Sequence, residues 1–438
     1  MLQGWPEKFV YVCSATRSAI VNALPLVHAG LTRVARVEVL VGADERESEE
    51  LDREGWNEAF LPALNLEWWL TQACAPDPPV VCRHYGNPDS FSVWATHMGA
   101  VVERAAKDGL TIVFNVSGGR RPMAVGALIG AAGRAQVIAV AGSSSCVEFI
   151  DGLQQREATR QAEMTLDDLL AVYGLAEIDR ASRIAKQEFY RRHASAIDAA
   201  ASTFLDWPDR EAARAALSVL NGALRGVGGS SRFNRKTIPI KDDPQLPPIA
   251  PVIRAASECL RPVGDFDARQ YGEELLVEFG EPQVAMLLRG QWLEGLIYNR
   301  ICEWTRGRND VEVSANVRLA HRLDEFGRTR VIHRGLELGE IDVALMVRSR
   351  LHIIEAKTAR FSGRDLKDQT ARSFEKIGRI RQLLQKQFGA CVIVNPRETK
   401  ESLMRSGDFP TRAADAGVSL LFGDDVMNKR RTIIREVL

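Results

Sequence analysis

The sequence lacks the cysteine patterns that build a zinc site or a disulfide framework. Its seven cysteines are odd in number and scattered, with no C-x-x-C pair and no Cys/His cluster. It also lacks a basic N-terminal segment followed by an apolar run, and Arg134 interrupts its most apolar stretch, 122–142. We therefore expect a soluble protein with reduced thiols, a cytoplasmic location and no membrane partner.

An excess of charge of either sign is missing as well. Lysine plus arginine and aspartate plus glutamate number 57 each, so any contact with nucleic acid has to come from local patches. Hydrophobic residues make up 45% of the chain and charged residues 26%, which excludes a disordered scaffold. With 438 residues, the chain is long enough for two or three domains.

Five short apolar runs alternate with helical patterns over the first third of the chain. The runs are continuous, which is typical of parallel strands that helices cover on both faces. They lie at 9–15, 37–43, 80–86, 111–117 and 137–143, and the clearest helical segments between them are 47–75 and 90–108. This pattern predicts a doubly wound, Rossmann-like α/β domain.

Beyond Asp151 the strand signals stop and helical periodicity takes over. We expect helices over 155–225 and a loop or linker over the Gly- and Pro-rich segment 226–251. An α+β order follows, with a helix at 282–304, strands at 311–321, 340–347 and 351–357, a helix at 365–387 and a strand at 390–395. The expected division is a domain at 1–152, a helical connector at 153–264 and a second α/β domain at 265–438.

The strongest chemical signal is a predicted hairpin that carries two acids and a lysine. Its first strand contains Asp342, and its second strand ends in Glu355-Ala356-Lys357. A turn centred near Ser349 would set Asp342 opposite the end of the second strand, and the strand period of two sends Glu355 and Lys357 to one face. Two carboxylates and an ammonium group are therefore expected to converge.

A third acid, Glu294, lies on the helix that precedes these strands, and its apolar neighbours would direct it towards the edge of the sheet. Such a group suits phosphodiester hydrolysis, because carboxylates hold a divalent cation that polarises the phosphoryl group and activates water. The lysine can orient or deprotonate that water. The alternative is a surface ion pair between Glu355 and Lys357, but the order of the acids along the elements favours a site.

This order resembles the PD-(D/E)xK nuclease superfamily over roughly 282–395, although Ile341 replaces the proline that names the motif. The resemblance implies a restriction-endonuclease-like α/β domain and a metal-dependent endonuclease. Its catalytic residues would be Glu294, Asp342, Glu355 and Lys357. Asp342, Glu355 and the carbonyl group of Ala356 would hold Mg²⁺ or Mn²⁺. The following segment, 357–386, has nine basic residues against three acidic ones, so it could lie along phosphates or form a solvated helical face.

A second signal is a Gly-rich segment, 115–123, that leaves a strand and enters a helix. Backbone amides at such a helix start face a bound anion, and arginines add phosphate donors. The loop 14–18 follows the first strand at the same sheet edge. Neither loop is a G-x-G-x-x-G or Walker A motif, which disfavours NAD and ATP, and a turn with solvated arginines is the alternative. The candidate ligand-binding residues are Ser14, Thr16, Arg17, Asn115, Ser117, Gly118, Gly119, Arg120, Arg121 and Met123.

The segment from Asn115 to Arg121 resembles the signature of CARF domains, the Rossmann-like sensors of CRISPR systems. With the nuclease motif, the whole chain resembles the CARF nucleases of type III CRISPR antiviral defence. The resemblance implies a homodimer that binds a cyclic oligoadenylate across paired CARF domains and then cleaves DNA or RNA. The activator would be cyclic tetra-adenylate, the commoner ring, or cyclic hexa-adenylate. A two-fold ligand suits an isologous interface.

Other functions stay open at this point. The chain could be a non-catalytic nucleotide sensor that binds nucleic acid, or a repair or restriction nuclease that no cyclic nucleotide controls. Arg328 and His333 have the R-x4-H spacing of HEPN ribonucleases. That motif belongs on a helix, whereas these residues fall in a predicted strand or hairpin, so we interpret the spacing as coincidence.

Overall fold

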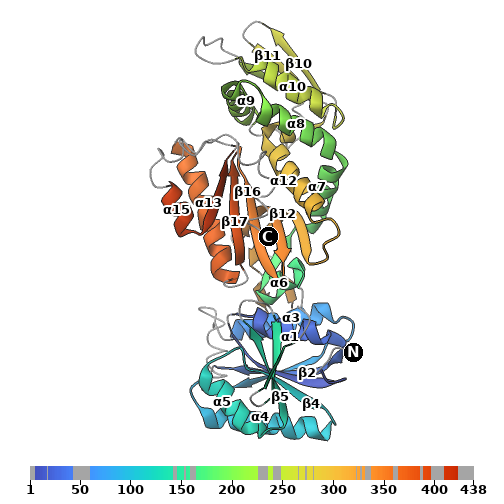
Figure 1. Cartoon of the computed structure of the whole chain (residues 1–438), viewed down its shortest axis with the longest axis vertical. Helices are drawn as coiled ribbons and strands as arrows, with labels where there is room; N and C mark the ends of the chain where they lie inside the picture. The colour runs from blue at the N-terminus through green and yellow to red at the C-terminus, as the bar shows by residue number, and fades with distance from the viewer. Residues whose placement is uncertain are drawn as a thin grey trace.

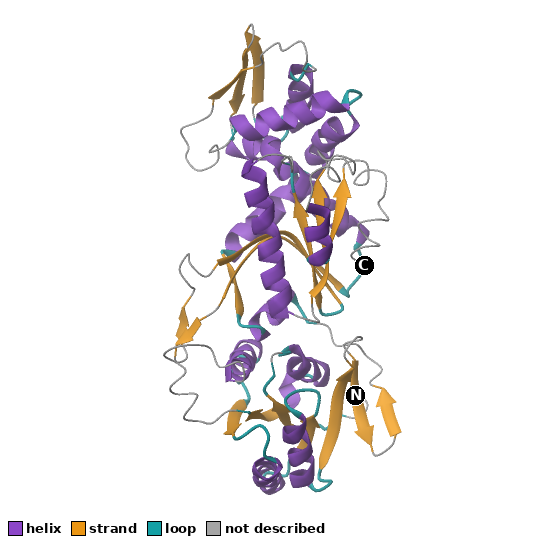
Figure 2. Ribbon diagram, turned by 90° about the vertical axis from the view of Figure 1, so that its left-hand side faces the viewer, coloured by secondary structure: helices purple, strands orange, loops and turns teal. Residues whose placement is uncertain are grey.

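The computed structural model is an elongated molecule with one large sheet near its N-terminal end and a second in its C-terminal half (Figures 1 and 2). None of the helices described is long and apolar enough to cross a membrane. Six cysteines of the described part, all except Cys146, are free thiols. The structure describes residues 5–16, 18–42, 60–141, 146–151, 154–157, 164–224, 235–239, 248–264, 266–271, 274–279, 281–321, 323–325, 328–330, 337–358, 364–384, 388–395 and 409–422.

The first sheet has seven strands in the order β3-β2-β1-β4-β5-β6-β7. Five parallel strands form its main part: β1 (Phe9–Ser14), β2 (Val34–Val41), β3 (Val80–Tyr85), β4 (Thr111–Asn115) and β5 (Ala135–Ala141). An antiparallel hairpin of β6 (Cys146–Asp151) and β7 (Gln154–Glu157) extends one edge.

Helices cover both faces of this sheet, which explains its continuous apolar strands. One face packs against α1 (Ile20–Ala29) and α3 (Phe60–Ala73), and the other against α4 (Phe91–Lys107) and α5 (Arg121–Ala131) (Figure 1). A short 3-10 turn, Leu31–Arg33, leads into β2. The predicted doubly wound α/β domain is confirmed.

The middle of the chain corrects the expectation that strands stop after Asp151. It does contain the helices α6 (Leu166–Val172), α7 (Arg180–Arg192), α8 (Ala194–Asp206), α9 (Arg210–Ala223) and α10 (Ala250–Leu260). It also contains β8 (Leu175–Ile178), and beyond it β9 (Arg235–Pro239), β10 (Phe266–Tyr271) and β11 (Glu274–Phe279), which form a separate three-stranded sheet. A strand as short as β8 has too few residues for a period of two to show in the sequence.

The second large sheet has the order β18-β17-β16-β15-β12-β8. Its strands from the C-terminal half are β12 (Val311–His321), β15 (Glu337–Val347), β16 (Arg350–Ala356), β17 (Phe388–Asn395) and β18 (Val418–Phe422), and the helices there are α11 (Pro282–Met286), α12 (Trp292–Trp304), α13 (Arg364–Leu384) and α15 (Phe409–Asp415). A π-helical turn, Leu287–Gln291, joins α11 to α12. The predicted order of helix, three strands, helix and strand is confirmed.

A small hairpin shows that Arg328, the first residue of the R-x4-H spacing, does not lie on a helix. It consists of β13 (Leu323–Glu325) and β14 (Arg328–Arg330). Arg328 therefore begins a strand, whereas His333 lies outside the described residues. The helix that a HEPN motif requires does not include Arg328.

Helix α6 joins the two large sheets, between which it lies in Figure 1. Its Leu169 is fully buried in an apolar cluster that extends from Tyr11 on β1 to Leu319 on β12. Hydrogen bonds connect α6 to both halves of the molecule. The indole N–H of Trp69 on α3 donates to Asp168 (2.9 Å), and the N–H of Leu166 donates to Glu312 on β12 (2.7 Å). The two sheets therefore share one core.

Truncating this shared core should destabilise the whole molecule. We expect Leu169→Ala to lower the free energy of unfolding by about 2 to 5 kcal/mol, because it leaves a cavity in buried apolar surroundings. Leu128→Ala on α5, where the side chain is more than a third exposed, is the matched control and should cost much less. Urea unfolding of both variants measures the difference, and equal losses would contradict the shared core.

Candidate active site

The hairpin of β15 and β16 sets two acids side by side. A two-residue turn, 348–349, closes it with both φ angles positive (49° and 60°), which matches the right-handed twist of the strands. The pairing of Val343 with Ile354 places Asp342 opposite Glu355. The hairpin expected from the sequence thus has the predicted register.

Lys357 bridges these two acids. Its ammonium group lies 2.9 Å from Glu355 Oε2 and 3.4 Å from Asp342 Oδ2. The backbone N–H of Ala356 also donates to Asp342 Oδ2 (2.7 Å). Both carboxylates are buried, Glu355 completely. Because a buried carboxylate without a partner costs several kcal/mol, Lys357 helps to keep both acids buried.

Helix α12 adds the third predicted acid. Buried apolar residues such as Leu293 and Ile297 pack it against the sheet beside Val343. Gly290, with φ at 137°, allows the start of the helix to approach Thr358, where a side chain at position 290 would collide. This packing brings Glu294 to the sheet near Asp342, as the sequence predicts.

Sequence reasoning missed one further carboxylate, that of Glu340. Together with Glu294, Asp342 and Glu355 it forms what we call the acid group. One carboxylate oxygen each from Glu294, Glu340 and Asp342 lie within 4.8 Å of one another. Glu340 stands two residues before Asp342 on β15, so the strand period of two could have indicated it. Hard oxygen donors at this spacing fit a divalent cation such as Mg²⁺ or Mn²⁺.

Two further lysines reach the acids from elsewhere in the fold. Lys376 on α13 donates to Glu355 Oε1 (2.7 Å) and to the carbonyl group of Glu340. Lys186 on α7 lies 2.9 Å from Glu294 Oε2. No spacing in the sequence indicates either contact, because each depends on how a distant helix packs against the sheet.

The surroundings separate the pKa values of the two hairpin acids. Burial and the adjacent Glu355 raise the pKa of Asp342 to about 7. Burial alone would also raise the pKa of Glu355, but Lys357 and Lys376 outweigh it and the pKa is lowered. Burial lowers the pKa of Lys357, but Asp342 and Glu355 raise it by more, so the pKa lies above its usual value. Lys357 is therefore a fixed cation at neutral pH, suited to orienting groups and offsetting charge rather than to accepting a proton.

The Gly-rich loop of the first domain lies at the carboxyl edge of the sheet. A Cβ at Gly118 would come within 2.9 Å of the carbonyl oxygen of Ser14, and Gly119 has φ at 78° and stands over the Ser14 side chain. The Ser14 hydroxyl is buried and has no partner in the described part of the chain. The two glycines thus bring the backbone close to the Ser14 hydroxyl, which can still make a hydrogen bond.

The other predicted ligand-binding residues divide between buried and exposed positions. The buried Asn115 amide donates to the Tyr11 hydroxyl (2.8 Å) and the Val21 carbonyl (2.7 Å). The Ser117 hydroxyl accepts from the N–H of Val140. Asn115 and Ser117 therefore hold the loop in place.

Arg120 and Arg121 stand exposed at the start of α5, and Arg120 pairs with Asp89 at 3.2 Å. Thr16 lies beside Gly118, and Met123 is buried with its sulfur near Gly119. The predicted Arg17 lies outside the described residues. The arginines are thus the loop's exposed cationic groups in the described part.

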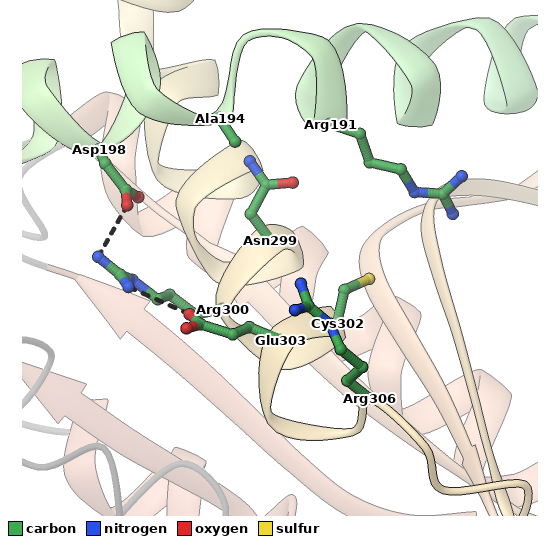
Figure 3. A pocket seen from close by; sticks show the side chains of 8 residues that line it. All are labelled: Arg191, Ala194, Asp198, Asn299, Arg300, Cys302, Glu303 and Arg306. Atoms are coloured by element: carbon green, nitrogen blue, oxygen red, sulfur yellow. Dashed lines mark hydrogen bonds and ion pairs between the residues drawn. The ribbon is translucent and has the colours of Figure 1, made fainter.

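A pocket of about 510 Å³ lies farther along α12, against α7 and α8 (Figure 3). Arg300 borders it and is paired with Asp198 (2.8 Å) and Glu303 (3.2 Å). None of the acids around Lys357 lines this pocket. It is a separate feature from the carboxylate group.

The raised pKa of Asp342 predicts a pH-dependent loss of stability in the metal-free protein. Between pH 4 and 7 the unfolded state, with a pKa near 3.9, has lost its proton while the folded state keeps it, so the free energy of unfolding falls as pH rises. Asp342→Asn removes this dependence. With chelator present, the melting temperature of the wild type minus that of Asp342→Asn should become smaller from pH 5 to pH 8. Equal changes of both melting temperatures with pH would contradict the raised pKa of Asp342.

Comparisons with known proteins agree with this geometry. A family model described as "Card1-like, endonuclease domain" matches residues 282–438. The crystal structure of protein VC1899 from Vibrio cholerae has a similar fold, with a TM-score of 0.67 and 17% identity over 97% of each chain. Can2 from Sulfobacillus thermosulfidooxidans, solved in complex with cyclic tetra-adenylate, has a TM-score of 0.59 and 12% identity over 98% of this chain and 99% of its own.

No functionally curated protein matches the sequence significantly. The family match covers α12, the β15–β16 hairpin and α13, which carry Glu294, Asp342, Glu355, Lys357 and Lys376. Residues 282–438, less than half of the chain, therefore match the model of Card1-like endonuclease domains.

Proposed function

We propose that this protein is a metal-dependent endonuclease of type III CRISPR defence that a cyclic oligoadenylate activates. The observation that carries the proposal is the group of carboxylates at Glu294, Glu340 and Asp342 within 4.8 Å of one another, inside a Card1-like endonuclease domain and next to Lys357. A non-catalytic binding domain has no need to bury two adjacent acids, Asp342 and Glu355, which is costly.

The residues of the acid group divide the work of phosphodiester hydrolysis. Asp342, Glu355 and the Ala356 carbonyl, with Glu294 and Glu340 beside them, would hold Mg²⁺ or Mn²⁺. A divalent cation supplies polarisation of the phosphoryl group and a lower pKa for water. Lys357, a fixed cation between Asp342 and Glu355, orients the attacking water and offsets the charge that develops on the phosphate.

The loop around Gly118 and Gly119 is the proposed site for the activator. Pro122 has no N–H and the Met123 N–H already donates to the Arg120 carbonyl (3.0 Å), so the proposed phosphate donors are the guanidinium group of Arg121 and the Ser14 hydroxyl, which has no partner among the described residues. Can2, whose whole-chain fold is similar, was solved with cyclic tetra-adenylate. We propose the same ring here, bound across a homodimer so that each subunit contributes the same loop.

The domain division follows from these two sites. Residues 1–152 would form the sensor domain, 153–264 the connector and 265–438 the nuclease domain. The connector touches both: α6 packs under α1 and α3, and the N–H of Met164 donates to the Ser349 hydroxyl (3.0 Å) in the turn of the catalytic hairpin. A shift in the sensor domain can thus reach Asp342 and Glu355 through direct contacts.

Removing either end of the Glu355–Lys357 pair should abolish cleavage. Glu355→Gln and Lys357→Met are expected to lower the rate at least about 100-fold, because each removes a charge in contact with the reacting groups. Glu375→Gln, at an exposed position on α13, is the matched control. Labelled DNA and RNA incubated with Mn²⁺ and each candidate ring give the rates, with chelator as the metal-free reference. Full cleavage by both variants would overturn the proposed site.

Arg121→Ala should weaken the binding of cyclic tetra-adenylate about 10-fold, as expected for the loss of one charge-assisted hydrogen bond. Arg134→Ala, exposed near the other end of α5, serves as the control. Isothermal titration calorimetry of the full chain measures both affinities. Equal affinities for Arg121→Ala and the wild type would argue against the loop as the phosphate site.

A further inference from the structure

Lys186 enters the acid group from outside the endonuclease domain. It lies on α7, and its ammonium group is 2.9 Å from Glu294 Oε2, 3.6 Å from Glu340 Oε1 and 2.7 Å from Asn316 Oδ1. Its side chain is only 16% exposed. The ammonium group of Lys186 therefore lies beside Glu294 and Glu340, at one side of the acid group.

Tyr190, one turn farther along α7, completes this contact. Its hydroxyl donates to Glu294 Oε2 (3.0 Å), and the Lys186 ammonium lies 5.8 Å from the centre of its ring. Residues four apart share one face of a helix, so the pair acts on Glu294 together. The contact is built from several fixed partners, unlike a solvated surface ion pair, which holds few of them.

Formal charge favours a single divalent ion in this group. Four carboxylates, those of Glu294, Glu340, Asp342 and Glu355, contact three ammonium groups, which leaves one negative charge when all four are ionised, as they are on a bound metal ion. One divalent ion turns this into one positive charge, which a phosphodiester balances. A second ion would leave an excess of three positive charges in a largely buried group, where uncompensated charge is costly.

We propose that Lys186 is a built-in cation that fills the second cation position, between Glu294 and Glu340, so that each protomer holds one divalent ion next to Asp342. This inference rests on the proposed function, because it takes the acid group to be a metal site. In this role Lys186 is a positioning residue: it fixes the two outer carboxylates. Removing its ammonium group opens a second position for a divalent ion.

The number of Mn²⁺ ions bound per protomer tests the proposal without any measurement of cleavage. Electron paramagnetic resonance of free Mn²⁺, titrated into the full-length chain, should give one bound ion for the wild type and two for Lys186→Met. Lys186→Arg keeps the charge and should keep one ion. Arg192→Met, exposed on the same helix, is the matched control and should also keep one.

Each outcome decides the matter. Two ions bound by the wild type, or one ion bound by a folded Lys186→Met, would overturn the role of Lys186 and leave the metal-dependent function intact. If Lys186→Met does not fold, the wild-type count decides alone, with one ion supporting the proposal and two overturning it. A wild type that binds no Mn²⁺ would contradict the proposed metal-dependent function itself.

Discussion

The buried ion pair network around Glu355 is the interaction on which the catalytic half of the molecule depends. Glu355 is fully buried and accepts from Lys357 and Lys376, which come from the end of β16 and from α13. Loss of one partner from such a network costs about 3 to 5 kcal/mol, because the other charge stays buried. The fold of this half is thus tied to the same charges that we propose for the chemistry.

This constraint explains why the connector cannot be a passive spacer. The acid group needs cations on every side, and the endonuclease domain supplies only Lys357 and Lys376 among the described contacts. Lys186 comes from α7, which follows β8, an edge strand of the nuclease sheet. The proposed active site is therefore assembled from two parts of the chain that are more than a hundred residues apart.

The predictable part of the site is the part that local rules determine. The register of a hairpin follows from its turn and from strand periodicity, so Asp342, Glu355 and Lys357 could be placed together from the sequence, and the same rule reaches Glu340. The contacts of Lys186 and Lys376 depend on how helices pack against a sheet, which no periodicity encodes. The strand β8 could not be predicted for a related reason: its four residues form a strand only because they pair with the edge of β12.

The Gly-rich loop of the first domain shows a similar division between residues that hold its shape and residues that we propose bind the ligand. A sequence motif groups Asn115, Ser117 and Arg121 as equals, but the first two are engaged with the backbone of β5 and α1 and hold the loop's shape. Among the described residues, the exposed Arg121 and the Ser14 hydroxyl, which has no partner there, are the groups with donors to spare. Since a buried hydroxyl without a partner is costly, a ligand that accepts its hydrogen bond gains more than one that meets solvated groups alone. Phosphate oxygens can accept from the Ser14 hydroxyl and pair with Arg121, which supports the proposal of an anionic ligand at this loop.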